Sequence, residues 1–420
     1  MGKTFLSLFS SFDKSELCQL YIHPSIPDVD ICNSYYNISD KQILKLGLFG
    51  KAGKEISAHD INEAANDRLN GVKTVSPANW KGIHPLKCIL RDTMWSVSKW
   101  FSPELNKWLD REAPSAIFLA PGYAKFIYNI TLKIAISRNL PVITYICDDY
   151  YFVNPPKTLL GKIYLNSLRK ITDKLLNNTE FLIVISEELK RVYSSHFLVD
   201  TQVIMIGADD NKLKISKSID RIQNISYFGN LGLGRHVPLA EIGHIIDSIN
   251  SKFDCNIQLN IYTNENSREV LSVFDNIKSA NIKGFISGKA FDEALRSADL
   301  LIHTESFNAK YIDMVKHSVS TKIADSLASG IPLLAYGPAD ISSIKHLIRN
   351  KCAVVATDPE ELKEKLFNLV LNNIDISSIS EHAKNTAKAW HDTKVNSLNL
   401  KSIFKTIEEQ FNERASNQGI

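Results

Sequence analysis

Short apolar runs alternate with longer amphipathic segments in the first half of the chain, from about residue 115 onward. The runs SAIFLA (115–120), PVITYI (141–146) and FLIVI (181–185) are rich in β-branched and aromatic residues and are too short for helices. The segment AKFIYNITLKIAISR (124–138) has helical period. This order predicts buried parallel strands connected by helices, which is a doubly wound α/β sheet.

The same alternation resumes after residue 224 and predicts a second α/β sheet. The expected strands are ISYF (225–228), IQLNIYT (257–263), ADLLIH (298–303), IPLLAY (331–336) and AVVA (353–356). Between the two sheets, VIMIGADDNKLK (203–214) has the composition of a crossing loop, with Gly207, Asp209, Asp210 and Asn211. We therefore predict a first domain over 1–207, a second over 208–375, and C-terminal helices over 376–420 for which a return to the first domain is one option.

The first hundred residues are less regular. LCQLYIHP (17–24) is a candidate strand, and LKCILRDTMWSVSKW (86–100) has an apolar stripe of helical period with Lys87, Arg91 and Lys99 on other faces. This helix has two interpretations. It either covers the sheet like an ordinary amphipathic helix, or its basic, tryptophan-bearing surface rests on anionic lipid.

Length and charge limit the class of protein. A chain of 420 residues is too long for one ordinary domain, and 49 basic against 46 acidic residues give a net charge of +3. That balance does not suggest a general nucleic-acid binder. The six cysteines are scattered, without metal-ligand spacing, and indicate reduced thiols. With neither a signal peptide nor a membrane span in the sequence, we expect a cytoplasmic protein that is at most peripheral to a membrane.

Ligands of open α/β sheets bind at the carboxyl ends of the strands, so the loops there are the candidate site. In the second sheet, GNLGLGR (229–235) has three glycines that let backbone amides approach an anion, and Arg235 adds charge. HSVSTK (317–322) precedes a helix that Ser320 and Thr321 can cap, and the start of this helix can receive a phosphate. Asp325, one turn further on, can accept hydrogen bonds from ribose hydroxyls.

Each feature also has a purely structural interpretation. The glycine loop can be a tight turn, the Ser and Thr residues can be simple helix caps, and Lys322 can be a solvated surface charge. At the first sheet, Asp148 and Asp149 follow VITYI, and either can cap a turn or helix.

Several motifs together resemble one family. The run from about 225 to 371 is similar to the donor-binding domain of GT-B glycosyltransferases, in particular family four, and 115–210 is similar to a lesser extent. FGNLGLGR resembles the glycine-rich loop of the family, with Arg235 at the basic position that touches the donor diphosphate. STKIADSLASGIPLLAYGP resembles the acidic helix and Gly-x-Pro entrance of capsule and surface-polysaccharide transferases, and Asp325 matches the acid that holds the ribose.

Three features depart from the family pattern. The family usually has a His-Asp pair where this chain has Cys147-Asp148. The first glutamate of the two-glutamate pattern of the family would fall at position 317, where this chain has His317. Relatives begin with a strand and a glycine-bearing loop, whereas this chain opens at MGKTFLSLF, which resembles the helix after that loop.

The resemblance implies an α/β protein of GT-B architecture, with two doubly wound Rossmann-like domains facing across a cleft. It further implies a metal-independent, retaining glycosyltransferase of surface polysaccharide synthesis that uses a nucleotide-sugar (a UDP-sugar favoured over a GDP-sugar) as substrate and no cofactor. The acceptor would be a glycan or a lipid-linked sugar, with no nucleic acid partner and with peripheral contact at the inner face of the cell membrane. The expected donor-binding residues are Gly229, Asn230, Gly232, Gly234, Arg235, Ser320, Thr321, Lys322 and Asp325.

In the mechanism that we expect, Arg235, Lys322 and helix N-termini stabilise the departing diphosphate without a metal. Asp148 orients the acceptor hydroxyl and Glu305 contacts the donor sugar. Two rival functions remain: a non-catalytic nucleotide-sugar-binding subunit, which the absent histidine favours, and a nucleotide-sugar epimerase, which can share the architecture.

Overall fold

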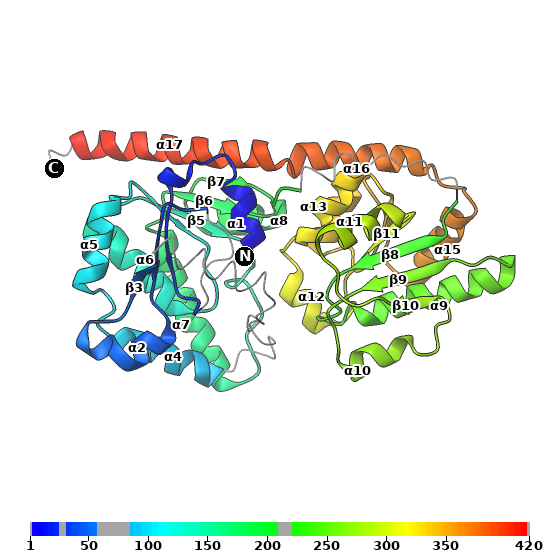
Figure 1. Cartoon of the computed structure of the whole chain (residues 1–420), viewed down its shortest axis with the longest axis horizontal. Coiled ribbons are helices and arrows are strands. Elements are labelled where there is room, and N and C mark those ends of the chain that lie inside the picture. Colours follow the sequence, from blue (N-terminus) through cyan, green and yellow to red (C-terminus); the bar gives the residue numbers. More distant parts are fainter. Residues whose placement is uncertain (1, 25–30, 57–84, 209–220, 418–420) are drawn as a thin grey trace. The chain divides into compact units, whose positions relative to one another are not determined.

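The chain forms two compact units in the computed structural model, which describes residues 2–24, 31–56, 85–208 and 221–417 (Figure 1). Unit 1 comprises Met1–Val184, Lys190–Val203 and Ser397–Ile420, and unit 2 comprises Ile185–Leu189 and Ile204–Asn396. The chain leaves unit 1 after Val203, so the predicted crossing loop begins at this junction. Its residues Asp209, Asp210 and Asn211 lie outside the described residues.

Unit 2 is built on one six-stranded parallel sheet. Its strands are β8 (Asn224–Phe228), β9 (Gln258–Tyr262), β10 (Ala280–Ile282), β11 (Leu300–Thr304), β12 (Leu333–Tyr336) and β13 (Val354–Ala356). They lie in the order β10-β9-β8-β11-β12-β13, so the strand order reverses between β8 and β11. This is the order 3-2-1-4-5-6 of dinucleotide-binding sheets, which bind ligands at that reversal.

Helices cover both faces of the unit 2 sheet, which explains why all five residues of β11 are buried. The helices are α9 (His236–Phe253), α10 (Arg268–Leu271), α11 (Gly288–Ser297), α12 (Ala309–Val315), α13 (Thr321–Ser329), α14 (Ser342–Asn350), α15 (Pro359–Val370) and α16 (Ile376–Trp390), with the 3-10 turn η4 (Ser272–Phe274). Apolar residues of α9 and α15 fill one side of the sheet. Those of α11, α13, α14 and α16 fill the other side.

Unit 1 contains two smaller sheets. A four-stranded parallel sheet has the order β4-β5-β6-β7, and a three-stranded sheet has the order β1-β2-β3. The strands are β1 (Cys18–Tyr21), β2 (Ser34–Asn37), β3 (Lys54–Ile56), β4 (Ile117–Leu119), β5 (Val142–Ile146), β6 (Phe181–Val184) and β7 (Thr201–Val203). β1 pairs with β2 in parallel, whereas β3 pairs with β2 antiparallel.

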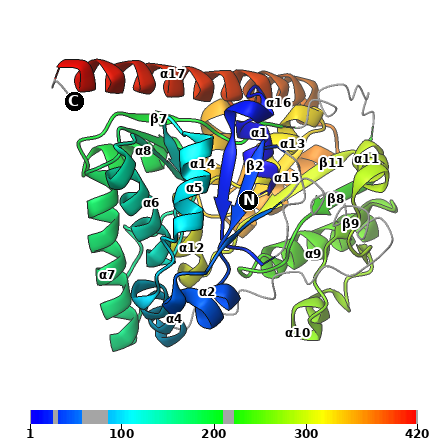
Figure 2. The same ribbon diagram turned by 60° about the vertical axis from the view of Figure 1, so that its left-hand side comes forward.

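The helices of unit 1 surround these sheets (Figure 2). They are α1 (Gly2–Leu8), α2 (Asp40–Leu46), α4 (Pro85–Val97), α5 (Pro103–Glu112), α6 (Lys125–Arg138), α7 (Leu159–Leu176) and the larger parts of α8 (Glu187–Ser194) and α17 (Thr393–Asn417), whose first residues belong to unit 2, with the 3-10 turns η1 (Lys14–Glu16) and η2 (Gly47–Phe49). The predicted strand over 17–24 and the helix over 86–100 are confirmed by β1 and α4. On α17, Phe404 packs on Phe12 and Phe118, with ring centroids 5.7 and 6.2 Å apart.

The described helices include none that is both long and apolar enough to cross a membrane.

Candidate functional site

The loop after β8 is a compact turn. Its glycines leave room for neighbouring side chains and allow backbone conformations with positive φ. Leu233 and Gly234 have positive φ values of 58° and 73°. A Cβ on Gly234 would lie 2.8 Å from both Ser306 Oγ and the Tyr311 ring, so any larger residue would push this loop away from the end of β11. The Asn230 side chain accepts a hydrogen bond from the Gly232 amide and closes the turn.

Arg235 ends this loop and forms an ion pair with Glu305. The Arg235 Nη2 atom lies 2.9 Å from Glu305 Oε2, and Arg235 Nε donates to the same oxygen at 3.1 Å. The two side chains are 18% and 3% exposed, so the pair is largely shielded from water. Glu305 directly follows β11, which places this pair where the strand order reverses between β8 and β11.

Glu305 remains ionised despite its burial. Burial alone raises the pKa of the Glu305 carboxyl, but His303 and Arg235 outweigh this effect and bring the pKa below its usual value of 4.5. His303 Nε2 lies 3.4 Å from Glu305 Oε1. His303 was not among the predicted site residues because it belongs to the buried strand β11, and only its position at the carboxyl end of ADLLIH distinguishes it in the sequence.

Lys322 brings a second positive charge to the same loop. The residue as a whole is exposed, but its ammonium group lies so close to Gly229 that a Cβ on Gly229 would collide with it. The Nζ atom is also 5.9 Å from the centroid of the Tyr227 ring. Burial of this ammonium and the charge of Arg235 lower the pKa of Lys322 to about 8, against the opposing effect of Glu305.

Helix α13 begins beside this cluster without a side-chain cap. Ser320 occupies the N-cap position, but neither Ser320 nor Thr321 makes the side-chain cap hydrogen bond expected from the sequence. The Ser320 amide instead donates to Ser343 Oγ at 3.0 Å, which fixes the entry to the helix. The Ile323 amide donates to the Ser320 carbonyl at 3.1 Å, so the amides of Thr321 and Lys322 are those at this helix start that can meet a phosphate.

Asp325 is half-buried within α13, one turn beyond Thr321. Asp325 lies near enough to His391 to affect its titration. Burial lowers the pKa of His391 to about 4, and the negative charge of Asp325 opposes this shift. Asp325 thus lies on the helix that starts at the cationic cluster.

Together, these residues gather positive charge at the strand-order reversal of unit 2. Arg235, Lys322 and the start of α13 provide positive charge and donors, and the absence of a side chain at Gly229 leaves room for the Lys322 ammonium beside the loop. Glu305 balances part of this charge. A diphosphate group has the charge and the acceptor oxygens to match it.

The predicted residues of unit 1 are arranged differently. Asp148 follows β5, is exposed, and accepts a hydrogen bond from Tyr150 Oη at 3.2 Å. The neighbouring Asp149 accepts bonds from the amides of Tyr151 and Phe152, both at 2.9 Å, so it caps a turn. Of the two acids, Asp148 is the more exposed.

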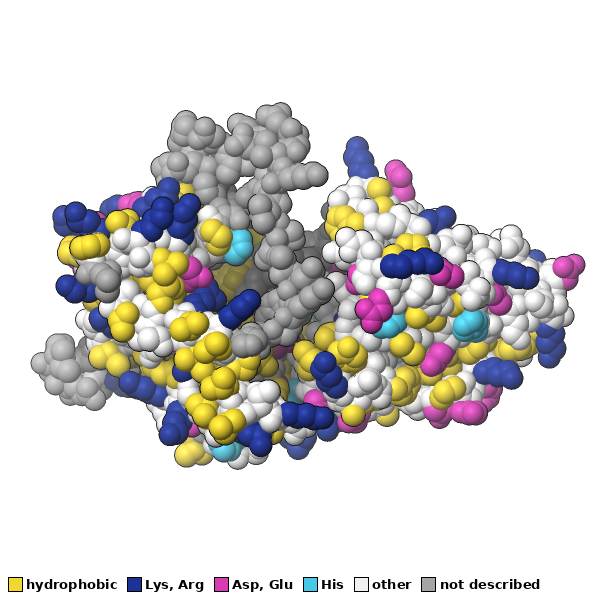
Figure 3. All heavy atoms as spheres, turned by 90° about the horizontal axis from the view of Figure 1, so that it is seen from below, with side chains coloured by type: hydrophobic (Ala, Val, Ile, Leu, Met, Phe, Trp, Pro, Cys, Tyr) yellow, Lys and Arg dark blue, Asp and Glu magenta, His cyan; other side chains and the backbone are white. Residues whose placement is uncertain are grey.

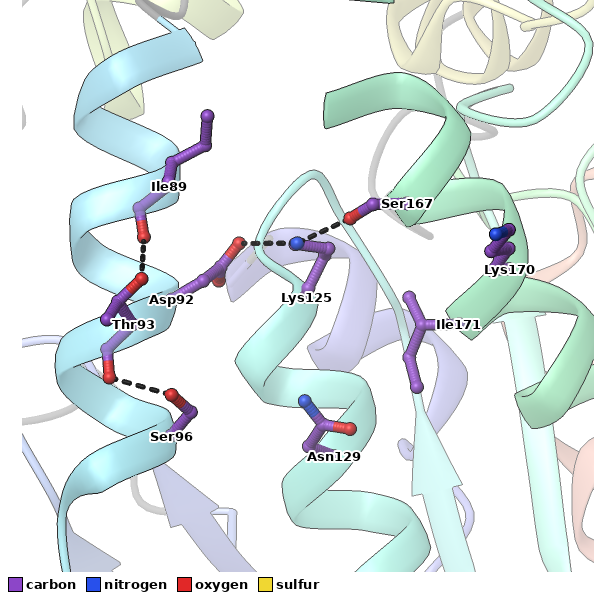
Figure 4. A pocket seen from close by; sticks show the side chains of 9 residues that line it. All are labelled: Ile89, Asp92, Thr93, Ser96, Lys125, Asn129, Ser167, Lys170 and Ile171. Carbon is purple, nitrogen blue, oxygen red and sulfur yellow. Dashed lines mark hydrogen bonds and ion pairs between the residues drawn. The ribbon is translucent and has the colours of Figure 1, made fainter. Parts of the chain in front are cut away.

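A hollow of about 390 Å³ in unit 1 contains none of the predicted site residues (Figure 4). It lies between α4 and α7 over α6. Lys125 points into it, 3.9 Å from Asp92 Oδ2 and within 2.5 Å of Ser167 Oγ. Asp92 thus balances the charge of Lys125 in this hollow. Among the described residues, no three His, Cys, Asp or Glu side chains gather in a way that could hold a metal ion.

Comparison with known proteins identifies the fold. No family model and no curated protein sequence matches the chain. Solved structures do match: a UDP-forming α,α-trehalose-phosphate synthase from Burkholderia vietnamiensis has a TM-score of 0.60 at 8% identity, over 98% of this chain and 96% of the other. A sucrose-phosphate synthase from Thermosynechococcus elongatus has a TM-score of 0.58 at 10% identity, over 79% and 81% of the two chains. HepE from Anabaena, solved in complex with UDP, has a TM-score of 0.55 at 12% identity, over 74% and 84%. The chain therefore has the GT-B fold of these glycosyltransferases.

Proposed function

We propose that this protein is a glycosyltransferase that takes a sugar from a nucleotide-sugar bound by unit 2. One observation carries the proposal: Arg235, Lys322 and the uncapped start of α13 gather at the strand-order reversal of a dinucleotide-type sheet. A sugar bound through a diphosphate leaves with that diphosphate. Groups that meet its growing negative charge therefore lower the barrier to transfer.

Each residue has a definite role in this proposal. Arg235 and Lys322 bind the diphosphate oxygens, and the amides of α13 receive one of its phosphates. Asp325 holds the ribose, and Glu305 positions Arg235 and contacts the donor sugar. The arrangement needs no metal, because two side-chain cations already supply positive charge.

The proposed donor is a UDP-sugar, with a GDP-sugar as the second choice. Support comes from the solved structures with this fold, since HepE was solved with UDP-glucose and TarM of S. aureus with UDP. We also propose that the anomeric configuration of the sugar is retained, on the basis of the family-four motifs in the sequence.

The proposed acceptor is a glycan or a lipid-linked sugar in surface polysaccharide synthesis, and unit 1 would supply the acceptor side. Asp148 would orient the acceptor hydroxyl, because its carboxylate lies exposed at the carboxyl end of β5. A lipid-linked acceptor would bring the enzyme to the inner face of the cell membrane as a peripheral protein.

A non-catalytic nucleotide-sugar-binding subunit is the second candidate. Cys147 precedes Asp148 where family-four transferases usually have histidine, and burial raises the pKa of the Cys147 thiol to about 11, so it is not a nucleophile at neutral pH. An epimerase is a third and weaker candidate, since only the shared architecture favours it.

Binding and turnover distinguish these candidates. Isothermal titration with UDP, GDP and their sugars should show a preferred ligand, and Arg235→Ala should weaken it by about 1.5–3 kcal/mol. The matched control is Arg268→Ala, which removes an exposed arginine paired with Asp275 elsewhere in unit 2. Acceptor-dependent release of UDP in the presence of a chelator supports a metal-independent transferase. Binding without turnover on any glycan or lipid-linked acceptor favours the subunit, and conversion of the donor without acceptor favours the epimerase.

A further inference from the structure

Three neighbouring segments of unit 1 expose large apolar side chains to solvent. Leu44 and Phe49 lie on α2 and η2, Leu86 and Leu90 on α4, and Leu159 and Ile163 in the first two turns of α7. Their exposed fractions range from 45% for Leu86 to 74% for Leu159. Single exposed apolar residues are ordinary, but a group of six on adjoining elements marks a contact surface.

These segments are contiguous. Helix α4 packs against both α2 and α7. Asp40, the first residue of α2, binds Arg91 and accepts a hydrogen bond from Trp95 Nε1 at 2.8 Å, which ties α2 to α4. Figure 4 shows α4 and α7 on either side of α6. Figure 3 shows hydrophobic side chains interspersed with Lys and Arg on the underside of unit 1.

The exposed leucines of α4 have no place in the core, because other residues of the helix fill its inward face. Trp95 is fully buried and stacks on Phe126, with ring centroids 4.3 Å apart. The hypothesis that this tryptophan meets lipid is therefore wrong, because Trp95 belongs to the core. The exposed leucines of α4 are Leu86 and Leu90, which lie four positions apart and hence on the same side of the helix.

The same segments carry a large excess of positive charge. Residues 40–51, 85–99 and 157–171 contain ten Lys or Arg, two Asp and no Glu. The rest of the chain contains 39 basic and 44 acidic residues, so it is slightly acidic. Positive charge is thus concentrated where apolar side chains are exposed, with Lys87 and Lys162 directly beside Leu86 and Ile163 in the sequence. Long lysine side chains can reach lipid headgroups while neighbouring leucines enter the acyl region.

We propose that this surface, formed by residues 40–51, 85–99 and 157–171, docks the protein on a membrane that contains anionic lipid. Charge complementarity favours a membrane over a protein partner. A protein partner would need an acidic face around an apolar centre, whereas an anionic bilayer has both negatively charged headgroups and an apolar interior. This docking rests on the proposed function, because a lipid-linked acceptor would bring the enzyme to a membrane.

The test is sedimentation of the full-length chain with vesicles of phosphatidylcholine alone or of phosphatidylcholine mixed with phosphatidylglycerol. We expect binding to the mixed vesicles only, and weaker binding as salt is raised. The double variant Lys87→Glu/Lys162→Glu should lower partitioning by at least about tenfold, since each charge near an anionic surface contributes substantially. The double variant Leu90→Gln/Ile163→Gln should lower it as well, and should leave binding to mixed vesicles more sensitive to salt.

Matched controls change residues of the same kind elsewhere. Leu198→Gln removes a fully exposed leucine of unit 1 outside the surface, and Lys283→Glu reverses an exposed charge of unit 2. Both should bind vesicles like the wild type, and all variants should keep their thermal midpoint and UDP affinity.

Three results would overturn the inference. One is the absence of wild-type binding to mixed vesicles, and another is equal binding to both kinds of vesicle. The third is a dimer in solution that Leu90→Gln/Ile163→Gln dissociates, which would make the surface an interface between copies. None of these results affects UDP binding by unit 2, so a failure here is distinct from a failure of the proposed function.

Discussion

The guanidinium of Arg235 and the carboxylate of Glu305 form a shielded ion pair across the strand-order reversal of unit 2, with Nη2 and Oε2 2.9 Å apart. Removing one member of a buried pair leaves the other charge uncompensated, which costs about 3–5 kcal/mol, whereas removing both costs less. We therefore expect Arg235→Ala and Glu305→Ala each to destabilise the protein strongly, and the double variant to lose less than the sum of the two. Urea unfolding of the four proteins measures the coupling.

A coupling near zero would mean that the pair does not exist in solution. Arg268→Ala/Asp275→Ala is the control cycle, because that pair is largely exposed and should show a coupling of at most about 1 kcal/mol.

Lys322 predicts how nucleotide binding depends on pH. Burial and the charge of Arg235 lower the pKa of Lys322 to about 8, and a bound diphosphate favours the charged ammonium and raises this pKa again. Binding at pH 8 should therefore take up protons, and UDP affinity should fall as pH rises above 8. Titration calorimetry in buffers of different ionisation enthalpy measures the uptake. Lys322→Arg should bind without it, because arginine stays charged throughout this range.

The sign for stability is the opposite of that for binding. The folded pKa lies below the unfolded value of 10.5, so the unfolded chain holds the proton more tightly. Lys322 therefore opposes folding below pH 8, and this effect disappears as pH rises from 8 through 10.5. In the free protein, Lys322→Met should raise the thermal midpoint more at pH 7 than at pH 10. An equal change at both pH values contradicts the lowered pKa.

Gly234 tests the close packing of the glycine loop. Its φ of 73° disfavours other residues, and a Cβ there would press on Ser306 and Tyr311. Gly284 is a matched control, since its φ is 74° but a Cβ there would meet nothing within 4 Å. Both alanine variants should lose roughly 1 kcal/mol from backbone strain. Only Gly234→Ala should lose more stability and also weaken UDP binding, which thermal unfolding and titration can measure.

Much of the sheet structure follows from local sequence pattern. VITYI and FLIVI are short runs rich in β-branched and aromatic residues, and they form the buried strands β5 and β6. β10 was not predicted, because ANI at 280–282 is short, polar at its centre and at the edge of its sheet. β2 was missed as well, although SYYN is fully buried, because its burial comes from contacts with distant residues such as Trp108.

The site is predictable only in part, for a physical reason. Parallel strand order is enough to place the loops of Arg235 and Lys322 at one end of the sheet. The pairing of Arg235 with Glu305 and the contact with His303 depend on which strands become neighbours, and β11 pairs with β8 although 71 residues separate Phe228 from Leu300. The prediction of a side-chain cap on α13 was wrong. The Ser320 amide before this helix is held instead by Ser343, a residue 23 positions away that no local sequence pattern links to the helix start.

Asp325 separates a donor-binding role from a structural one. A carboxylate in the early part of a helix is favoured by the helix dipole, a contribution of about 0.3–1 kcal/mol to stability. If that were the only role of Asp325, Asp325→Asn would lower stability slightly and leave UDP affinity unchanged. If Asp325 accepts hydrogen bonds from both ribose hydroxyls, the amide loses one good acceptor, and we expect affinity to fall by about 1–3 kcal/mol while the fold persists.

The deoxy ligand makes this test independent of stability. A 2′-deoxy nucleotide lacks one of the two hydroxyls, so the wild type should bind 2′-deoxy-UDP more weakly than UDP, and Asp325→Asn should bind the two about equally. Asp313→Asn is a suitable control, because Asp313 lies on the neighbouring helix α12 of unit 2 and has no predicted ligand role. Titration calorimetry with both nucleotides gives the four affinities. Equal binding of UDP and 2′-deoxy-UDP by the wild type would show that Asp325 acts on the helix and not on the ribose.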